Sequence, residues 1–216
     1  MPGENVDRRV KKTKRQLRLA LMELMCEKPQ KHISVRELAE RADINRGTFY
    51  IHYKDVSDLL QQLEDEMADR LSEMCCLHAR NTEIDSYPFL TDLYGFMLDN
   101  ADICKVLLGT NGDIAYRQRI CGILHDDFLY DFLSRFYPEN RQKLEYFCAF
   151  IVSGNLNLAL TWLNEGAKES PKEMAQLAGE IIMKGVGFCG KSIHVNLPGG
   201  NNRCADRSYT AVCGAY

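Results

Sequence analysis

Apolar residues recur every three or four positions along most of the chain, and prolines and glycines separate the periodic stretches. This spacing predicts amphipathic α-helices. No stretch alternates at period two over the length of a strand, so we expect an all-α fold. The predicted helices are one that ends before Pro29, residues 35–42, a short one after Asn45, a long one after Asp55, and residues 86–99, 102–108, 113–136, 139–163 and 171–191.

Polar N-caps mark two short neighbouring helices. Ser34 and Glu37 have the spacing of a capping box, and Asn45 stands where the next helix is expected to begin. Only Asp43 and Ile44 separate the two helices, and a basic amphipathic helix precedes them. This arrangement predicts a helix-turn-helix.

In a helix-turn-helix, the second helix presents its N-terminal residues to the major groove of duplex DNA. An arginine there can donate two hydrogen bonds to a guanine edge, and a threonine can contact a base or a thymine methyl. Hydroxyls, basic side chains and helix N-termini can hold the phosphates on either side. We therefore predict base contacts from Asn45, Arg46, Gly47 and Thr48, and phosphate contacts from Thr13, Ser34, Arg36, Tyr50, His52 and Lys54.

The segment Ile33–Asp55 resembles the DNA-binding segment of the tetracycline-repressor (TetR) family of bacterial regulators, and the similarity extends from about Val10 to Leu63. The caps, the turn, the glycine and the aromatic residues agree in order and spacing. The resemblance implies a homodimer, an all-helical C-terminal domain that binds a ligand, and repression of a palindromic operator that ends when an effector binds.

Two features of the sequence concern the place of this chain within the family. The run Tyr50–Asp55 and the region Gly154–Gly166 are similar to the dihydroxyacetone-kinase-regulator (DhaS-like) branch, which would suit an activator with a protein partner. Many family members place a lysine one residue after the cap of the fourth helix, where this chain has Val56. Lys54 takes that role in our prediction.

The distribution of charge favours a nucleic-acid partner. The 216 residues carry a net charge of −3 at pH 7, but residues 1–56 hold 13 Lys and Arg against 8 Asp and Glu, and residues 57–216 hold 14 against 22. A basic part joined to an acidic one suggests a surface for a polyanion, although a solvated helix face would give the same count. We expect a DNA-binding domain of residues 1–56, an effector-binding and dimerisation domain of residues 57–195, and a poorly ordered tail of residues 196–216.

Aromatic residues concentrate in the C-terminal part. Residues 86–165 hold 14 of the 20 aromatic residues, a density typical of a small-molecule pocket and equally of helix packing. As effector-pocket residues we predict Tyr94, His125, Phe128, Asn155 and Trp162. The expected effector is an unknown small molecule, and the alternative is control by a protein coregulator or a thiol switch.

The last two predicted helices favour a second copy of the chain as partner. Residues 139–163 are apolar nearly all round, and residues 171–191 carry an apolar stripe. A two-fold four-helix interface would cover both, and burial within one chain is the alternative. Paired helix-turn-helix units read half-sites about 34 to 36 Å apart, which favours a homodimer.

Other classes of protein have little support. The sequence has no H-E-x-x-H, G-x-S-x-G, P-loop or Cys/His cluster, so a small all-helical enzyme is a remote alternative and we expect no metal or cofactor. The nine cysteines lack C-x-x-C spacing and are expected to be reduced, with Cys75, Cys76, Cys204 and Cys213 as redox candidates. Phe147–Leu163 falls short of the roughly 20 apolar residues that a membrane span needs. With no signal-peptide pattern, we expect a cytoplasmic protein.

Overall fold

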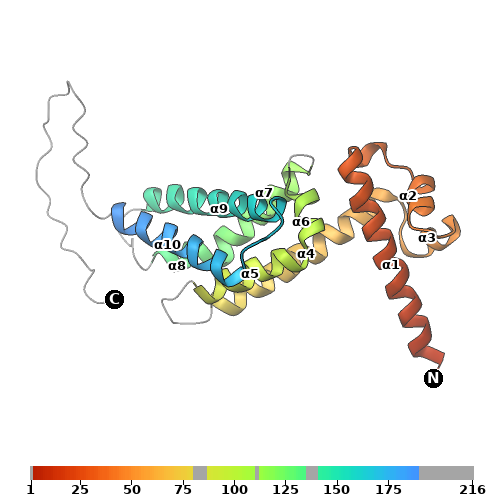
Figure 1. Ribbon diagram of the computed structural model, residues 1–216, viewed down its shortest axis with the longest axis horizontal. Helices are drawn as coiled ribbons and strands as arrows, with labels where there is room; N and C mark the ends of the chain where they lie inside the picture. Colours follow the sequence, from red (N-terminus) through yellow and green to blue (C-terminus); the bar gives the residue numbers. More distant parts are fainter. Residues whose placement is uncertain (1, 80–86, 110–111, 135–140, 190–216) are drawn as a thin grey trace, which may run out of the picture.

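The computed structural model describes residues 2–79, 87–109, 112–134 and 141–189, and side chains are described there except for residues 2–7, 131 and 183–189. Within these ranges the regular elements are helices and none is a strand, which confirms the predicted all-α fold (Figure 1). In chain order they are α1 (Pro2–Glu27), η1 (Gln30–His32), α2 (Val35–Arg41), α3 (Arg46–His52), α4 (Val56–Ala79), α5 (Tyr87–Asp99), α6 (Ala101–Leu107), α7 (Ile114–Leu124), η2 (His125–Leu129), α8 (Tyr130–Ser134), α9 (Arg141–Asn164) and α10 (Pro171–Cys189). The predicted tail, residues 196–216, lies outside the described residues.

The first three helices pack around large apolar side chains. Leu17, Leu21 and Leu24 of α1 are fully buried, and so are Leu38 of α2 and Phe49 of α3. Because α3 has only seven residues, this burial rather than its own backbone hydrogen bonds holds it in place. One side of α3 is thereby fixed to the core, and the other stays in solvent.

The predicted N-caps are present. The Ser34 hydroxyl accepts a hydrogen bond from the Glu37 amide (3.2 Å), and the Glu37 carboxylate accepts one from the Ser34 amide. Asn45 Oδ1 accepts from the Gly47 amide (2.8 Å), and the Asp55 carboxylate caps the start of α4. The starts of α2, α3 and α4 therefore follow the sequence prediction.

A left-handed residue makes the turn between α2 and α3. Asp43 has a φ of 53°, a conformation that aspartate tolerates better than most residues. The Ile44 amide then donates back to the Ala39 carbonyl (3.0 Å), which ends α2. This short closed turn sets the direction in which α3 leaves α2.

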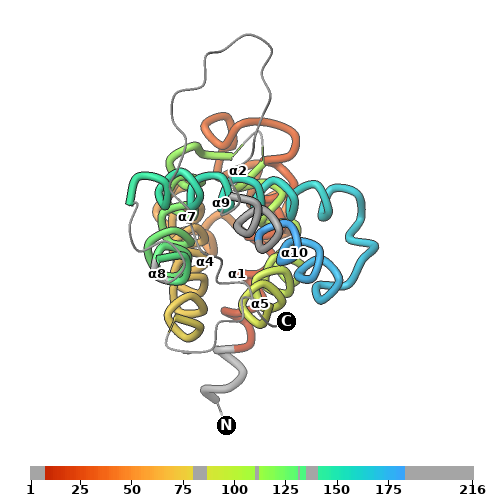
Figure 2. Tube along the Cα trace, turned by 90° about the vertical axis from the view of Figure 1, so that its left-hand side faces the viewer, coloured from red at the N-terminus to blue at the C-terminus, as the bar shows by residue number. Residues whose placement is uncertain are grey.

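Helix α4 leaves the N-terminal unit and runs along the C-terminal domain (Figure 1). There α5 contacts α10, α7 and η2 contact α4, and α9 contacts α6, α8 and η2. Viewed along the long axis, α4, α5 and α7 to α10 surround a common interior (Figure 2). This interior contains the cavities described below.

One predicted helix is interrupted. We expected a continuous helix over residues 113–136, but α7 ends at residue 124 and a π-helical turn, η2, precedes α8. The Tyr130 amide donates to the His125 carbonyl, one residue further along than in an α-helix. The extra residue lets Phe128 lie in the interior while Asp127 accepts a hydrogen bond from the Ser72 hydroxyl of α4. A periodic apolar pattern does not reveal such a single-turn insertion.

Helix α9 is long and apolar. By length and composition, it is the one helix in the described part of the chain that could cross a membrane, which the sequence analysis of residues 147–163 did not predict. In the fold it contacts α6, α8 and η2, and it buries Cys148, Val152 and Leu156. One face of α9 is therefore packed against other helices of the C-terminal domain.

Candidate DNA-binding surface and effector cavity

The predicted base-contact residues lie together at the start of α3. Asn45, Arg46 and Gly47 are exposed, and Thr48 is half-buried. Figure 1 shows α2 and α3 at the end of the molecule opposite the C-terminal helices. The N-terminal end of α3 is therefore open to a large partner, as reading a major groove requires.

The cap of α3 uses part of the hydrogen-bonding capacity of these residues. Because Asn45 Oδ1 accepts from the Gly47 amide, the Asn45 Nδ2 is the group left for a base edge. A Cβ on Gly47 would lie 3.3 Å from Asn45 Oδ1, a tight contact, so glycine suits a position directly on the cap. The exposed Arg46 guanidinium keeps the two-donor geometry that matches guanine.

The predicted phosphate-contact residues differ in their availability. Tyr50 and Lys54 are exposed, whereas Thr13 and His52 are half-buried. The Ser34 hydroxyl is already used as a cap, so only its spare lone pair and proton remain. Tyr50 and Lys54 are thus the residues of this group most open to a phosphate.

Arg36 forms an ion pair within its own helix. Its Nε lies 2.8 Å from Glu40 Oε1 one helical turn further on, and both side chains are about two-thirds exposed. Exposed pairs of this spacing contribute only about 0.3 to 0.5 kcal/mol. A phosphate can therefore replace Glu40 as the partner of Arg36 at small cost.

A cluster that the sequence analysis missed joins α1, α3 and α4. Arg18 of α1 forms an ion pair with Glu66 of α4, and that cation holds the pKa of Glu66 below its usual value. Tyr53, at the end of α3, lies beside Arg18, and the Lys14 ammonium is 6.0 Å from the centroid of its ring. Because Arg18 and Glu66 are 48 positions apart, no local pattern could have paired them.

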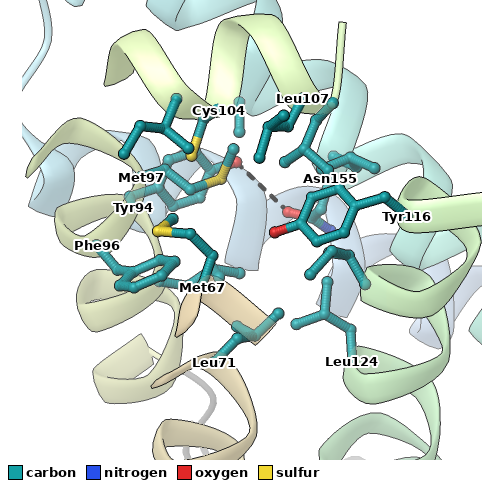
Figure 3. A pocket seen from close by; sticks show the side chains of 16 residues that line it. Met67, Leu71, Tyr94, Phe96, Met97, Cys104, Leu107, Tyr116, Leu124 and Asn155 are labelled. Carbon is teal, nitrogen blue, oxygen red and sulfur yellow. Dashed lines mark hydrogen bonds between the residues drawn. The ribbon is translucent and has the colours of Figure 1, made fainter. Parts of the chain in front are cut away.

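An apolar cavity of about 40 Å³ lies between α4, α5, α6, α7 and α9 (Figure 3). The Tyr94 hydroxyl lies 3.5 Å from Asn155 Oδ1, and Figure 3 shows the Tyr116 ring pointing into the same space. Burial raises the pKa of both tyrosines, so their hydroxyls stay protonated and can donate. The lining consists of Met67, Leu71, Leu93, Tyr94, Phe96, Met97, Ile103, Cys104, Leu107, Leu108, Tyr116, Ile120, Leu124, Asn155, Leu156 and Ala159.

A second apolar cavity of about 40 Å³ adjoins the first, because Leu93, Leu124 and Asn155 line both. Stacked rings form one of its walls, with 3.8 Å between the centroids of Phe89 and Phe128. Its other lining residues are Leu90, Leu129, Phe132, Ile151, Val152 and Ile182. Three predicted pocket residues, Tyr94, Phe128 and Asn155, therefore line these cavities.

The other two predicted pocket residues lie outside both cavities. Trp162 is buried behind Tyr94, with 5.6 Å between ring centroids, and its Nε1 donates to the Glu169 carbonyl (3.2 Å). His125 lies on the outer side of η2, where its Nε2 is 3.0 Å from Glu145 of α9. Aromatic density could not separate a residue in the lining from one behind it, and the π-helical turn directs His125 outward.

Helix α4 is both a wall of the first cavity and an anchor of the N-terminal unit. Its neighbouring residues Asp65 and Glu66 have different partners. Asp65 pairs with Arg119 of α7 (2.5 Å), and Glu66 pairs with α1 as described above. A single turn of α4 therefore contacts both α7 and α1.

A buried carboxyl precedes these two residues on α4. Glu64 is 7% exposed, and no salt bridge to it occurs in the described part of the chain. Burial, together with the nearby negative charges of Asp113 and Asp65, raises the pKa of Glu64 to about 7. Burial at the contact between α4 and α7 therefore favours the protonated, neutral form of Glu64.

The candidate thiols differ in their surroundings. Cys75 is buried, and burial with the nearby charge of Asp127 raises its pKa to about 12. Such a thiol stays protonated and is a poor nucleophile. Cys76 is exposed, and Cys204 and Cys213 lie outside the described residues. The structure gives the thiol-switch alternative no support at Cys75.

Large apolar side chains are exposed on α9 and α10, which contact each other. Tyr146 and Phe150, one turn apart on α9, are 65% and 73% exposed. Leu177 and Ile181, one turn apart on α10, are 47% and 53% exposed. We call these four residues the exposed apolar face. Large apolar side chains exposed to this degree are candidates for a site of protein contact.

Residues 85–184, just under half of the chain, match the TetR family described as "Transcriptional regulator C-terminal region". The uncharacterized HTH-type transcriptional regulator YxbF of Bacillus subtilis (strain 168) is 24% identical over 177 residues, which cover 77% of this chain and 44% of that protein. The chain thus spans less than half the length of this curated relative.

Solved structures share the fold at low identity. The TetR transcriptional regulator from Streptococcus agalactiae 2603V has a TM-score of 0.56 and 21% identity, and the match covers 83% of this chain and 98% of that one. The regulator FadR from Bacillus subtilis, in complex with stearoyl-CoA, has a TM-score of 0.57 and 16% identity, covering 79% and 97%. These matches support the two-part architecture, whereas the narrower DhaS-like resemblance stays a prediction.

Proposed function

We propose that the chain is a transcriptional regulator of the TetR family that represses genes by binding a palindromic operator as a homodimer. In this proposal an apolar small molecule enters the C-terminal domain and releases the operator. The observation that carries the proposal is the exposed N-terminal end of α3, where Asn45 and Arg46 stand on a capped helix fixed by buried Phe49. We also propose that the protein acts in the cytoplasm.

The lining of the two cavities supports an apolar effector. Tyr94, Tyr116 and Asn155 are the polar side chains among otherwise apolar residues, so they would orient a ligand that the rest holds by burial. At about 40 Å³ each, the cavities are small, so an effector must separate the surrounding helices as it enters. Since FadR of Bacillus subtilis was solved with stearoyl-CoA, acyl chains are the first class to test.

The contacts of α4 supply a route from the cavity to the DNA. An effector between α4 and α7 would separate Met67 from Tyr116 and move α7, which holds Asp65 through Arg119. The pair Glu66 with Arg18 would carry the movement of α4 to α1. An effector shifts this equilibrium only if it binds the two states with different affinity.

The test of DNA binding is a binding-site selection with the purified chain on random duplex DNA, with the oligomeric state recorded by light scattering. We expect enrichment of a palindrome bound by a dimer. No enrichment above that of a non-binding control protein would contradict the proposed function.

The test of the effector measures release of that operator by acyl-CoA and fatty acids of increasing chain length. Asn155→Leu, which removes the amide shared by both cavities, should raise the effector concentration needed for release about tenfold while leaving operator affinity unchanged. Asn164→Leu, at an exposed position on the same helix, is the control. Equal responses of the two variants would place the effector elsewhere.

A further inference from the structure

Helix α1 is longer than its packing requires. It spans 26 residues, Pro2–Glu27, yet the first buried side chain among those described is Leu17. Figure 1 shows that the N-terminal half of α1 projects past α2, α3 and α4, at the end of the molecule that carries α3. The folded core does not account for this half of the helix.

The projecting half is strongly cationic. Between Asp7 and Glu23 the sequence has seven Lys and Arg and no Asp or Glu. Arg8, Lys12 and Arg15 are exposed and stand at positions i, i+4 and i+7, which lie on one face of a helix. We call these three residues the cationic stripe. Over seven residues a helix rises about 10 Å, so the stripe spans about three base pairs of duplex.

Like charges at this spacing weaken a helix, and Glu4, one turn before Arg8, is the only acidic residue in the sequence three or four positions from a member of the stripe. A polyanion would offset this repulsion. Duplex DNA carries one negative charge per about 1.7 Å of its axis and would lie against α3 at the same end of the molecule. An anionic membrane suits the stripe less well, because residues 8–18 contain no aromatic side chain to insert between lipids.

We propose that the cationic stripe binds the phosphates of duplex DNA flanking the bases read by α3, so that each protomer holds the DNA at two separate places. The proposal rests on the proposed DNA-binding function. Since phosphate contacts carry no sequence information, the stripe adds affinity and footprint length without changing base preference.

The test uses the full chain and the variant Arg8→Gln/Lys12→Gln/Arg15→Gln, because glutamine keeps the helix propensity of the residues that it replaces. Operator affinity is measured over a range of salt concentrations. Each phosphate contact contributes about 0.9 to the slope of log affinity against log salt, so the dimer's slope should fall by about 2 for one lost contact per protomer and by about 5 for three. The order of preference among operator variants should not change.

The matched control is Arg141→Gln/Lys168→Gln/Lys172→Gln, which removes the same charge from exposed positions of the C-terminal domain. A duplex trimmed to the selected palindrome should weaken the wild type and leave the stripe variant unaffected. An unchanged slope in the stripe variant, or an equal fall in the control, would overturn the proposal. The proposal would also be overturned if the stripe variant lost binding to anionic vesicles but kept the wild-type slope of log operator affinity against log salt.

The outcomes separate this proposal from the one on which it rests. If Arg46→Ala abolishes discrimination between operators while the stripe variant behaves as wild type, α3 reads DNA and the stripe does not contribute. If the wild type selects no sequence at all, both proposals are wrong.

Discussion

Single polar residues around α3 divide into those that hold the protein together and those that remain open to a partner. The side-chain oxygens of Ser34 and Asn45 accept amides of their own helices, whereas Arg46 and Lys54 are exposed. The caps fix where each helix begins, and that start determines where the exposed residues point. In the proposed function, the reading of DNA would therefore depend on residues of both kinds.

Arg46→Ala should weaken binding to the specific operator by about 1 to 3 kcal/mol and relax the preference at one operator position. Arg46→Lys keeps the charge but loses the two-donor geometry, so it should lose the same preference. Competition binding with single-base operator variants measures both. Full recovery of preference in the lysine variant would mean that Arg46 meets a phosphate instead.

Glu64→Gln should stabilise the protein above neutral pH and not at low pH. The pKa of Glu64 is about 7 in the folded chain against an ordinary 4.5, so its contribution is fully present below pH 4.5 and is lost as pH rises through 7. Above that range, removing the buried charge should raise the free energy of unfolding by about 1 to 3 kcal/mol. Urea unfolding at fixed protein concentration tests this.

Glu73→Gln, at an exposed position of the same helix, is the control for Glu64 and should show no pH-dependent gain. A gain in Glu64→Gln that is equal at acidic and alkaline pH would show that its ionisation is not the cause.

Among the elements, α3 depends most on its neighbours. Its seven residues are well below the roughly 12 to 15 at which isolated helices become stable. It is held by the burial of Phe49 and by the cap from Asn45. The element that would read DNA is therefore also one that a single lost cap can loosen.

Asn45 allows capping and DNA contact to be separated. Asn45→Ala removes the cap and should cost about 1 kcal/mol of stability, together with operator affinity. Asn45→Asp keeps a cap of equal quality but brings a negative charge towards DNA, so stability should be retained while affinity falls. Thermal unfolding and operator binding of the two variants distinguish these effects. Unchanged stability in the alanine variant would show that the cap contributes little.

In the molecule as a whole, α4 connects the helix-turn-helix with the helices around the cavities, and the exposed apolar face lies on α9 and α10. The first cavity, the contacts to α7 and the contacts to α1 all involve α4. A dimer formed through the exposed apolar face would hold two copies of α3 at one spacing. Control of DNA binding would then be a change in that spacing.

Phe150→Glu should convert the dimer to a monomer and abolish operator binding at concentrations where the wild type binds. An unpaired charge buried in an interface costs about 3 to 5 kcal/mol, and a two-fold dimer would bury two. Ile114→Glu, at a side chain of similar exposure on α7 (75% against 73%), should leave the dimer intact. Light scattering checks both variants. A dimeric Phe150→Glu protein would place the interface elsewhere.

Local sequence patterns were sufficient to predict most of the helices, their caps and the helix-turn-helix. The caps at Ser34, Asn45 and Asp55 were predictable because each is a hydrogen bond across two or three residues. Apolar periodicity likewise reports on one helix at a time. The base and phosphate contacts follow from that motif and stay predictions.

The three-dimensional structure was needed to show which distant residues meet. It paired Arg18 with Glu66, buried Glu64 between α4 and α7, and placed Trp162 behind the cavity rather than in its lining. It also put a π-helical turn where periodicity predicted a continuous helix, which directed His125 outward. Caps and periodicity are local properties of the chain, whereas burial and cavities depend on how helices far apart in sequence pack against one another.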